Sequence, residues 1–133
     1  MDQDTRTPPR TGGSTAEQRV ALGAYGEKVA ARHLQEQGMV LLDRNWRCDA
    51  GEIDLVLRDG RALVVCEVKT RSSNDYGSPL EAVTEAKAQR LRRLAARWIE
   101  ATGFHPPEVR IDLVGVLRGR TGAASIDHVR GVG

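Results

Sequence analysis

Residues 51–71 read GEIDLVLRDGRALVVCEVKTR, and this stretch decides the fold. Two runs of apolar and β-branched residues flank the pair Asp59-Gly60, a pattern that predicts a β-hairpin. With Asp59 and Gly60 as a two-residue loop, Arg58 faces Arg61 and the strands pair outward from there. Because side chains alternate along a strand, one face is predicted to be core and carries Ile53, Leu55, Leu57, Val64, Cys66 and Val68.

The opposite face of this hairpin mixes apolar side chains with charged ones: Glu52, Asp54, Val56, Leu63, Val65, Glu67 and Lys69. In the expected register Asp54 is a diagonal neighbour of Glu67, with Cα atoms roughly 7–8 Å apart. Two carboxylates at that separation can converge on one hard divalent cation, and Lys69 follows on the same face. A metal beside an ammonium group suits phosphodiester hydrolysis, because both stabilise phosphate charge.

A structural explanation of these charges is that they protect an exposed sheet edge from pairing with another chain. Carboxylates set close together on one face are destabilising without a counter-ion, however. A bound metal ion would supply that counter-ion, so the cost favours the interpretation of these residues as a metal site.

Length and composition place the chain among ordinary globular proteins. Its 133 residues suit one domain, predicted over residues 14–133, and residues 1–13 read as a disordered tail rich in Thr, Pro, Arg and Gly. The net charge of +2 does not by itself indicate nucleic acid binding. Cys48 and Cys66 lack zinc spacing, and no apolar run suits a membrane span or a secretion signal, so we expect a cytoplasmic protein with reduced thiols.

A first helix is expected from Ser14 or Thr15 to about Gln37, with Ser14 and Glu17 as a capping box and Gly38 after its end. Its apolar stripe consists of Val20, Ala24, Ala31 and Leu34. Glu27 falls inside the stripe, where a charge is costly without a partner unless it lies at the mouth of a cleft. The adjacent Gly26 would allow close backbone approach.

Further strands are predicted over residues 39–46, 109–117 and 125–129, the last at a sheet edge. A second helix begins either near Pro79, through the spacing of Ser78 and Glu81, or at Thr84. Its apolar stripe consists of Leu91, Leu94, Ala95, Trp98 and Ile99. Asp112 is expected either to support the site or to cap a sheet end.

Basic residues gather on this second helix, namely Lys87, Arg90, Arg92, Arg93 and Arg97. Such a face can neutralise phosphates, although a solvated helix surface is the ordinary alternative. Arg71 lies in a loop that leaves the strand carrying Glu67, and loops in that position often contact substrate.

Several motifs in order resemble one protein family. They are Gly26-Glu27, Arg44-Asn45-Trp46, Gly51-Glu52-Ile53-Asp54, Glu67-Val68-Lys69-Thr70-Arg71, and Ala82-Val83-Thr84 with Lys87. Over about residues 23–116 the chain resembles the YraN-like family, an uncharacterised bacterial group within the PD-(D/E)XK restriction-endonuclease-like superfamily, similar to archaeal Holliday junction resolvases.

The resemblance implies an α/β restriction-endonuclease-like core, with a mixed central sheet flanked by helices, and magnesium-dependent cleavage of nucleic acid. Carried over by position, Asp54 and Glu67 would be metal ligands, Lys69 the catalytic lysine and Glu27 the helix carboxylate that completes the site. The proline that usually precedes the motif aspartate is Ile53 here.

The leading hypothesis is therefore a Mg²⁺- or Mn²⁺-dependent nuclease that acts on nucleic acid, with DNA, including branched or otherwise structured DNA, favoured over RNA. Arg71, Lys87, Arg90, Arg93 and Arg97 would bind the nucleic-acid backbone. A homodimer is expected because cutting two strands symmetrically needs two sites. The alternatives are a module that binds nucleic acid without cutting it and a protein-interaction domain that uses the basic helix.

Overall fold

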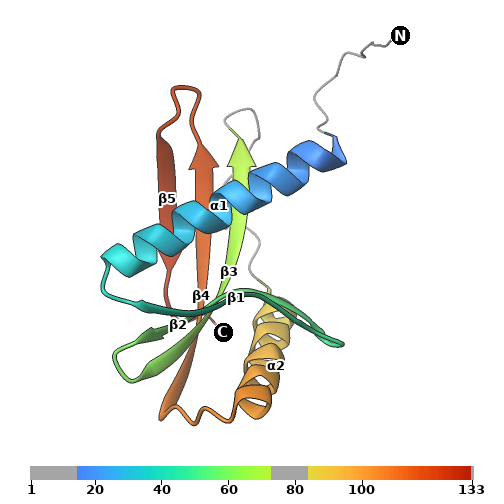
Figure 1. Ribbon diagram of the computed structural model, residues 1–133, viewed down its shortest axis with the longest axis vertical. Helices are drawn as coiled ribbons and strands as arrows, with labels where there is room; N and C mark the ends of the chain where they lie inside the picture. The colour runs from blue at the N-terminus through green and yellow to red at the C-terminus, as the bar shows by residue number, and fades with distance from the viewer. Residues whose placement is uncertain (1–14, 73–83, 133) are drawn as a thin grey trace.

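The computed structural model describes residues 15–72 and 84–132. Two helices and five strands follow one another along the chain, as Figure 1 shows: α1 (Ala16–Glu36), β1 (Val40–Cys48), β2 (Gly51–Asp59), β3 (Ala62–Ser72), α2 (Glu85–Thr102), β4 (Glu108–Arg118) and β5 (Ala124–Val129). The predicted tail at residues 1–13, and Pro79 with the Ser78–Glu81 spacing, lie outside the described residues.

The five strands form one mixed sheet in the order β1-β2-β3-β4-β5. Neighbouring strands are antiparallel except β3 and β4, which are parallel and joined through α2. The predicted α/β class with a mixed sheet flanked by helices is confirmed, and it is compatible with a restriction-endonuclease-like core.

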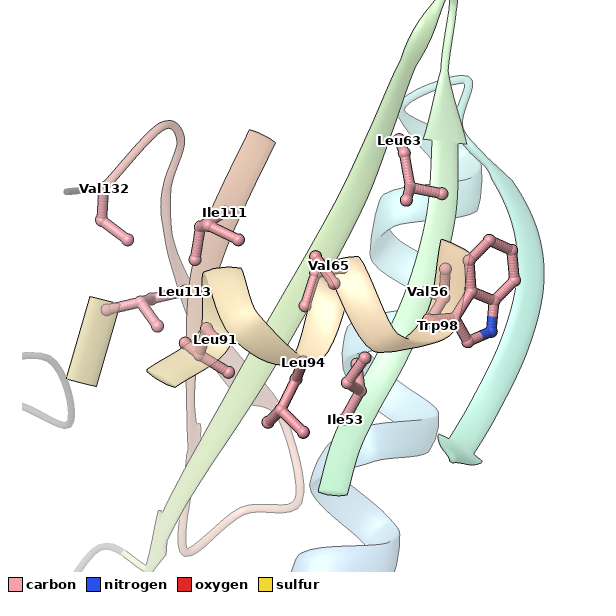
Figure 2. Close-up of a cluster of buried hydrophobic side chains, with 11 residues drawn as sticks. Ile53, Val56, Leu63, Val65, Leu91, Leu94, Trp98, Ile111, Leu113 and Val132 are labelled. Carbon is pink, nitrogen blue, oxygen red and sulfur yellow. The ribbon is translucent and has the colours of Figure 1, made fainter. Parts of the chain in front are cut away.

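Both faces of the sheet are buried, each beneath one helix. On one face Ala30, Ala31 and Leu34 of α1 pack against a cluster that includes Leu55, Leu57, Val64 and Cys66. On the other face Leu91, Leu94, Ala95 and Trp98 of α2 pack against Ile53, Val56, Leu63, Val65, Ile111 and Leu113 (Figure 2). The sequence had predicted a core on only one face of the hairpin, whereas the structure has one on each face.

The hairpin register differs from the expected one by two positions. Asp59 pairs with Ala62, so that Gly60 and Arg61 form the loop in place of Asp59 and Gly60. Gly60 has φ +60°, and Arg61 has no positive φ. Only the first loop residue therefore needs the left-handed region, which places glycine first in a two-residue turn.

The expected face of Ile53 is wrong. Ile53 lies in the cluster beneath α2, together with Val56, whereas Leu55 lies beneath α1. The β2–β3 ladder ends at the pair of Leu55 and Cys66, so β2 is free to turn where it parts from β3. The strict alternation assumed from the sequence fails at that point.

The edge-strand explanation of the charges on the hairpin stays open. Strands β2 and β3 are interior strands in the sheet order, but their mutual pairing ends at Leu55 and Cys66. Beyond that pair β2 is paired only with β1 and β3 only with β4, so Asp54, Glu67 and Lys69 lie on stretches with one unpaired side.

Helix α1 begins one residue later than the expected capping box. Thr15 Oγ1 accepts a hydrogen bond from Gln18 N, and Gln18 Oε1 accepts one from Thr15 N. The predicted stripe is wrong in its first half, because Val20 is 73% exposed and Ala24 is exposed too. That half of α1 extends beyond the sheet in Figure 1, while Ala30, Ala31 and Leu34 cover it.

Gly26 of α1 meets β3 at very close range, as expected from the sequence. A Cβ atom built on Gly26 would lie 1.8 Å from Thr70 Oγ1. Glycine is therefore needed for α1 to sit this close to the strand that carries Glu67 and Lys69.

The start of α2 is settled in favour of Thr84, whose side chain accepts a hydrogen bond from Lys87 N at 3.1 Å. Gly103 ends the helix in the left-handed conformation, with φ +74°. The expected stripe is confirmed: Leu91, Leu94, Ala95 and Trp98 are buried, and Ile99 packs beside them. The expected strands over 39–46, 109–117 and 125–129 correspond to β1, β4 and β5.

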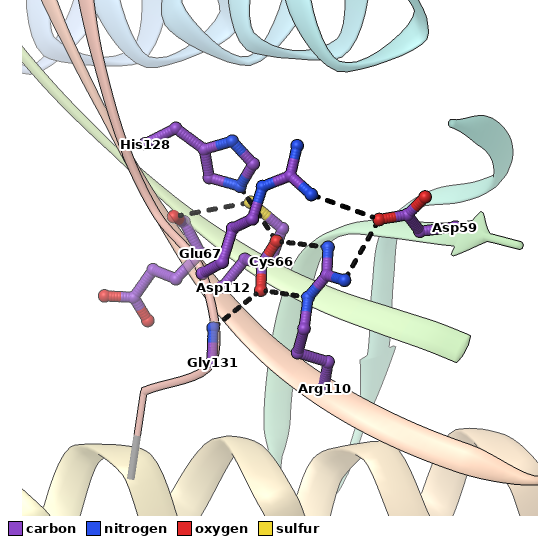
Figure 3. Close-up of polar contacts among 8 residues, drawn as sticks. Asp59, Cys66, Glu67, Arg110, Asp112, His128 and Gly131 are labelled. Atoms are coloured by element: carbon purple, nitrogen blue, oxygen red, sulfur yellow. Dashed lines mark hydrogen bonds and ion pairs between the residues drawn. The ribbon is translucent and has the colours of Figure 1, made fainter. Parts of the chain in front are cut away.

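A polar network fastens the end of the chain to β4 (Figure 3). Asp112 is fully buried and accepts two hydrogen bonds from Arg110, at 2.9 and 3.0 Å, and one from Gly131 N at 3.1 Å. Its Oδ2 also lies 2.8 Å from His128 Nε2. Asp59 in turn pairs with Arg110 and Arg130. These partners make Asp112 the centre of a structural network.

Candidate metal and phosphate site

The candidate site forms where β2 parts from β3, a region that we call the fork and define as residues 52–54 and 67–69. Asp54 Oδ2 accepts a hydrogen bond of 2.8 Å from Val68 N. A side-chain carboxylate thus replaces the main-chain acceptor beyond the end of the β2–β3 ladder. Because Val68 stands between Glu67 and Lys69, this bond brings Asp54 beside both residues.

The half-buried Asp54 carboxyl resists ionisation. Burial raises its pKa to about 7, the hydrogen bond from Val68 opposes that rise, and the nearby Glu27, Glu67 and Glu52 add to it. The four carboxyl groups come from α1, β2 and β3, so the fold concentrates negative charge at the fork.

Glu67 is paired with two cations from α2. Lys87 Nζ lies 2.6 Å from Glu67 Oε2, and Arg90 Nη2 lies 3.2 Å from Glu67 Oε1. Lys87 and Arg90 were expected to contact phosphate, and the structure places both beside the predicted metal ligand. The basic helix therefore meets the carboxylates at one site.

Lys69 lies two residues beyond Glu67 on β3, which pairs regularly with β4 along its whole length. Regular alternation places Lys69 on the same face of the sheet as Glu67. Its side chain is half-buried and has no ion pair or hydrogen bond with the residues of 15–72 and 84–132. The expected loop at Arg71 is wrong, because β3 runs to Ser72; Arg71 continues the same row and is also half-buried.

The two remaining arginines predicted to bind nucleic acid lie farther along α2. Arg97 is paired with Asp49, in the turn between β1 and β2, and Arg93 is exposed. The structure therefore groups Lys87 and Arg90 with the fork, whereas Arg97 holds the turn of a neighbouring hairpin.

Asn45 and Glu52 belong to the site and were not among the expected site residues. Asn45 Nδ2 donates to Glu27 Oε1 at 2.9 Å and lies 3.4 Å from Glu52 Oε2. Asn45 has φ +49°, and it is the one non-glycine residue with positive φ among the described residues. Asparagine tolerates that conformation better than most residues, and its place beside Trp46 in a family motif was the available signal.

The donor set of the fork fits a hard divalent cation. Asp54 and Glu67 offer carboxylate oxygens, and Mg²⁺ usually takes one or two carboxylates and keeps several waters. A carboxylate has about four acceptor sites, so Glu67 can pair with Lys87 and Arg90 and still offer a lone pair. Within residues 15–72 and 84–132, no group of three or more His, Cys, Asp or Glu side chains is arranged to hold a metal.

The two cysteines and Trp46 are not part of the proposed donor set. Cys48 and Cys66 are free thiols, and burial raises the pKa of Cys66 well above its ordinary value. Trp46 packs at the rim of the cluster beneath α2, as a core or rim aromatic would. None of the helices in the described part of the chain is long and apolar enough to cross a membrane.

Comparisons with known proteins agree on one family. The model of the uncharacterised protein family UPF0102 matches residues 26–116. A UPF0102 protein of a Nocardioides species is 64% identical over 123 residues, which cover 92% of this chain and 99% of the relative. Relatives from Beutenbergia cavernae (60% identical, covering 85% of this chain and 96% of the relative) and Streptomyces coelicolor (57%, covering 91% and 95%) carry the same family name.

Proposed function

Since this chain belongs to the UPF0102 family, the YraN-like family that its motifs resemble, we propose that it is a metal-dependent nuclease whose site is the fork. The substrate that we propose is DNA, in a branched or otherwise structured form. We further propose that the family is part of the PD-(D/E)XK superfamily. The element order and the mixed sheet are compatible with that placement.

The hydrogen bond from Val68 N to Asp54 Oδ2 carries this proposal. It fixes the Asp54 carboxylate against the stretch of β3 that carries Glu67 and Lys69, in a half-buried position where a charge is costly. A protein that only bound nucleic acid would gain nothing from carboxylates facing phosphate. The arrangement is useful once a cation lies between the carboxylates and the substrate.

Each residue of the fork has a distinct part in the proposed reaction. Asp54 and Glu67 would hold Mg²⁺ or Mn²⁺, and Glu27 would assist through the metal or through a water. Lys69, whose ammonium group pairs with nothing in residues 15–72 and 84–132, stabilises the charge that develops on the phosphate oxygens. A bound divalent cation would itself offset phosphate charge and lower the pKa of a water molecule.

The cations of α2 bind the nucleic-acid backbone. Lys87 and Arg90 lie within reach of Glu67, so they can bind a phosphate that sits at the fork. Arg93 and Arg71 extend the positive surface beyond it, and Arg97 contributes at the far end. The free thiols of Cys48 and Cys66 suit a reducing compartment, and we propose the cytoplasm.

The first test compares Asp54→Asn with the unchanged protein in thermal melts with and without Mg²⁺, and in a cleavage assay. The assay uses duplex, single-stranded, flap and four-way-junction DNA. Asn keeps an acceptor for Val68 N and removes a half-buried charge, so the metal-free variant should melt at a higher temperature. Mg²⁺ should raise the melting temperature of the unchanged protein only, because it binds the folded state.

Lys69→Met should keep the Mg²⁺-dependent stabilisation and lose cleavage, because Lys69 acts on the phosphate and not on the metal. Asp127→Asn, which removes an exposed carboxylate on β5, is the matched control and should cut normally. If Asp54→Asn retains its response to Mg²⁺, or if both fork variants cut like the unchanged protein, the site is wrong. Binding that is indifferent to Mg²⁺ and occurs without cleavage would support the inert binding module.

A further inference from the structure

A groove lies on the side of α1 that faces β5, away from the fork. It has a volume of about 730 Å³ and is bordered by the second half of α1, the turn between β4 and β5, and β5 itself. Pockets that hold small ligands have volumes of this order. Nothing in the proposed reaction uses this groove.

The groove has an apolar floor and a basic rim. Tyr25 and Val29 of α1 and Ala124 and Ile126 of β5 supply the floor. Lys28, Arg32 and His33 supply nitrogen groups at the rim, against one carboxylate, Glu36. The guanidinium of Arg118 lies over one face of the Tyr25 ring, 5.6 Å from its centre, so a base can stack only on the other face or at the ring edge.

Lys28 and Arg32 are exposed and lie one helical turn apart. Two like charges at that spacing repel each other. Neither side chain has an ion pair or hydrogen bond to the residues of 15–72 and 84–132. An anion between them would relieve the repulsion, so the rim is suited to phosphate.

We propose that this groove binds a single strand of nucleic acid, with bases on the floor beside Tyr25 and phosphates on Lys28 and Arg32. Bases can reach an apolar floor only when they are unpaired, whereas a duplex would present its phosphates alone. The proposal rests on the proposed nuclease function and names its substrate more closely. The substrate is a structure that has a single-stranded arm.

The position of the groove relative to the fork supports this substrate. Glu27 on one side of α1 faces the fork, and Lys28 on the adjoining side borders the groove. A helix with its side chains is about 10–12 Å across. Glu27 and the groove are therefore separated by no more than the width of α1.

The test measures binding without cleavage, in the Asp54→Asn background with a chelator present. Fluorescein-labelled twelve-residue oligothymidylate and oligouridylate are titrated by anisotropy over a range of salt concentrations. Lys28→Gln with Arg32→Gln should make the log–log salt slope shallower by about 1.4, because each phosphate contact on a single strand contributes about 0.7. Tyr25→Leu, which keeps an apolar floor without an aromatic ring, should weaken binding about tenfold.

Arg58→Gln with Arg61→Gln is the matched control, since it removes two exposed charges at the β2–β3 turn. This control should leave the slope and the affinity of the oligonucleotides unchanged. An oligonucleotide that carries 5-iododeoxyuridine should crosslink on irradiation to the peptide containing Tyr25, which mass spectrometry identifies.

Three results would overturn the groove proposal. They are an equal slope change in the control variant, equal dependence of blunt-duplex binding on Lys28 and Arg32, and binding of thymidine monophosphate as tight as that of the oligonucleotide. Each of these leaves the nuclease proposal intact, because the Mg²⁺ response and cleavage by the unchanged protein are measured separately.

Discussion

Asn45 shows how one residue can organise a site made of repelling groups. Its left-handed backbone, at φ +49°, directs one side-chain amide toward Glu27 and Glu52. An amide donor shared by two carboxylates reduces their repulsion without adding a charge. Most residues avoid this backbone conformation, and in Asn45 it directs the amide that binds the Glu27 carboxylate.

Asp112 is the residue whose charge should matter most for stability. Burial raises its pKa, but the hydrogen bonds from Arg110, His128 and Gly131 outweigh burial, so the pKa is lowered overall. Asp112→Asn should therefore cost about 3 kcal/mol in the free energy of unfolding at pH 7, because it leaves Arg110 without its buried partner. Denaturant unfolding at several pH values measures this cost.

The pH dependence of that cost follows from the direction of the pKa shift. A lowered folded-state pKa gives stability that is fully present above the ordinary value of 3.8 and is lost as pH falls through the folded-state pKa. The difference between Asp112→Asn and the unchanged protein should shrink as the pH falls below about 4. Asp127→Asn, an exposed carboxylate on β5, should show no such pattern.

At the scale of elements, the contact between α1 and β3 determines where Glu27 stands relative to Lys69. Gly26→Ala would bring a methyl group within 1.8 Å of Thr70 Oγ1, so α1 must move or β3 must bend. We expect a loss of about 1–3 kcal/mol in the free energy of unfolding, and weaker cleavage. Adding Thr70→Gly should restore much of the stability, because it removes the atoms in the way.

Gly23→Ala provides the control for that experiment, since a Cβ atom there meets nothing within 4 Å. In the same helix it should raise stability by up to about 1 kcal/mol, through helix propensity alone. Equal effects at the two glycines in thermal or chemical unfolding would show that the close approach at Thr70 is unimportant.

The sequence predicted the elements better than it predicted their pairing. Apolar spacing identified the stripe of α2, and Gly38 was correctly placed after the end of α1. The register was wrong because Asp59-Gly60 can enter a turn in more than one way, and the choice depends on which residue takes positive φ. The first half of α1 was misplaced because periodicity marks an apolar face without showing whether anything covers it.

At the scale of the whole molecule, the residues of the proposed site came from motifs, while their interactions came from the fold. Asp54, Glu67 and Lys69 could be named because charges stand out on apolar strands. The pairing of Glu67 with Lys87 and Arg90 could not be predicted from the sequence, since it depends on how α2 crosses the sheet. Asn45 and Glu52 were missed because their contacts depend on the positive φ of Asn45, which the sequence does not show.

The number of chains that act together on one junction is a property of the whole molecule. One chain offers one fork, and symmetric cleavage of two strands needs two, so we expect a twofold homodimer at least on junction DNA. Sedimentation velocity of Asp54→Asn with a four-way junction and Mg²⁺ should give the mass of two chains per junction. A single chain per junction, and a monomer in its absence, would contradict this.

The parallel pairing of β3 with β4 also sets an order for folding. Strands β1, β2 and β3 are joined by short turns, and such local pairs close quickly. Pairing of β3 with β4 must wait until α2 has been synthesised and the longer segment closes, which costs more chain entropy. During synthesis, Asp54 and Glu67 therefore come together before Lys87 and Arg90 arrive, so the neutralisation of Glu67 is a late event in folding.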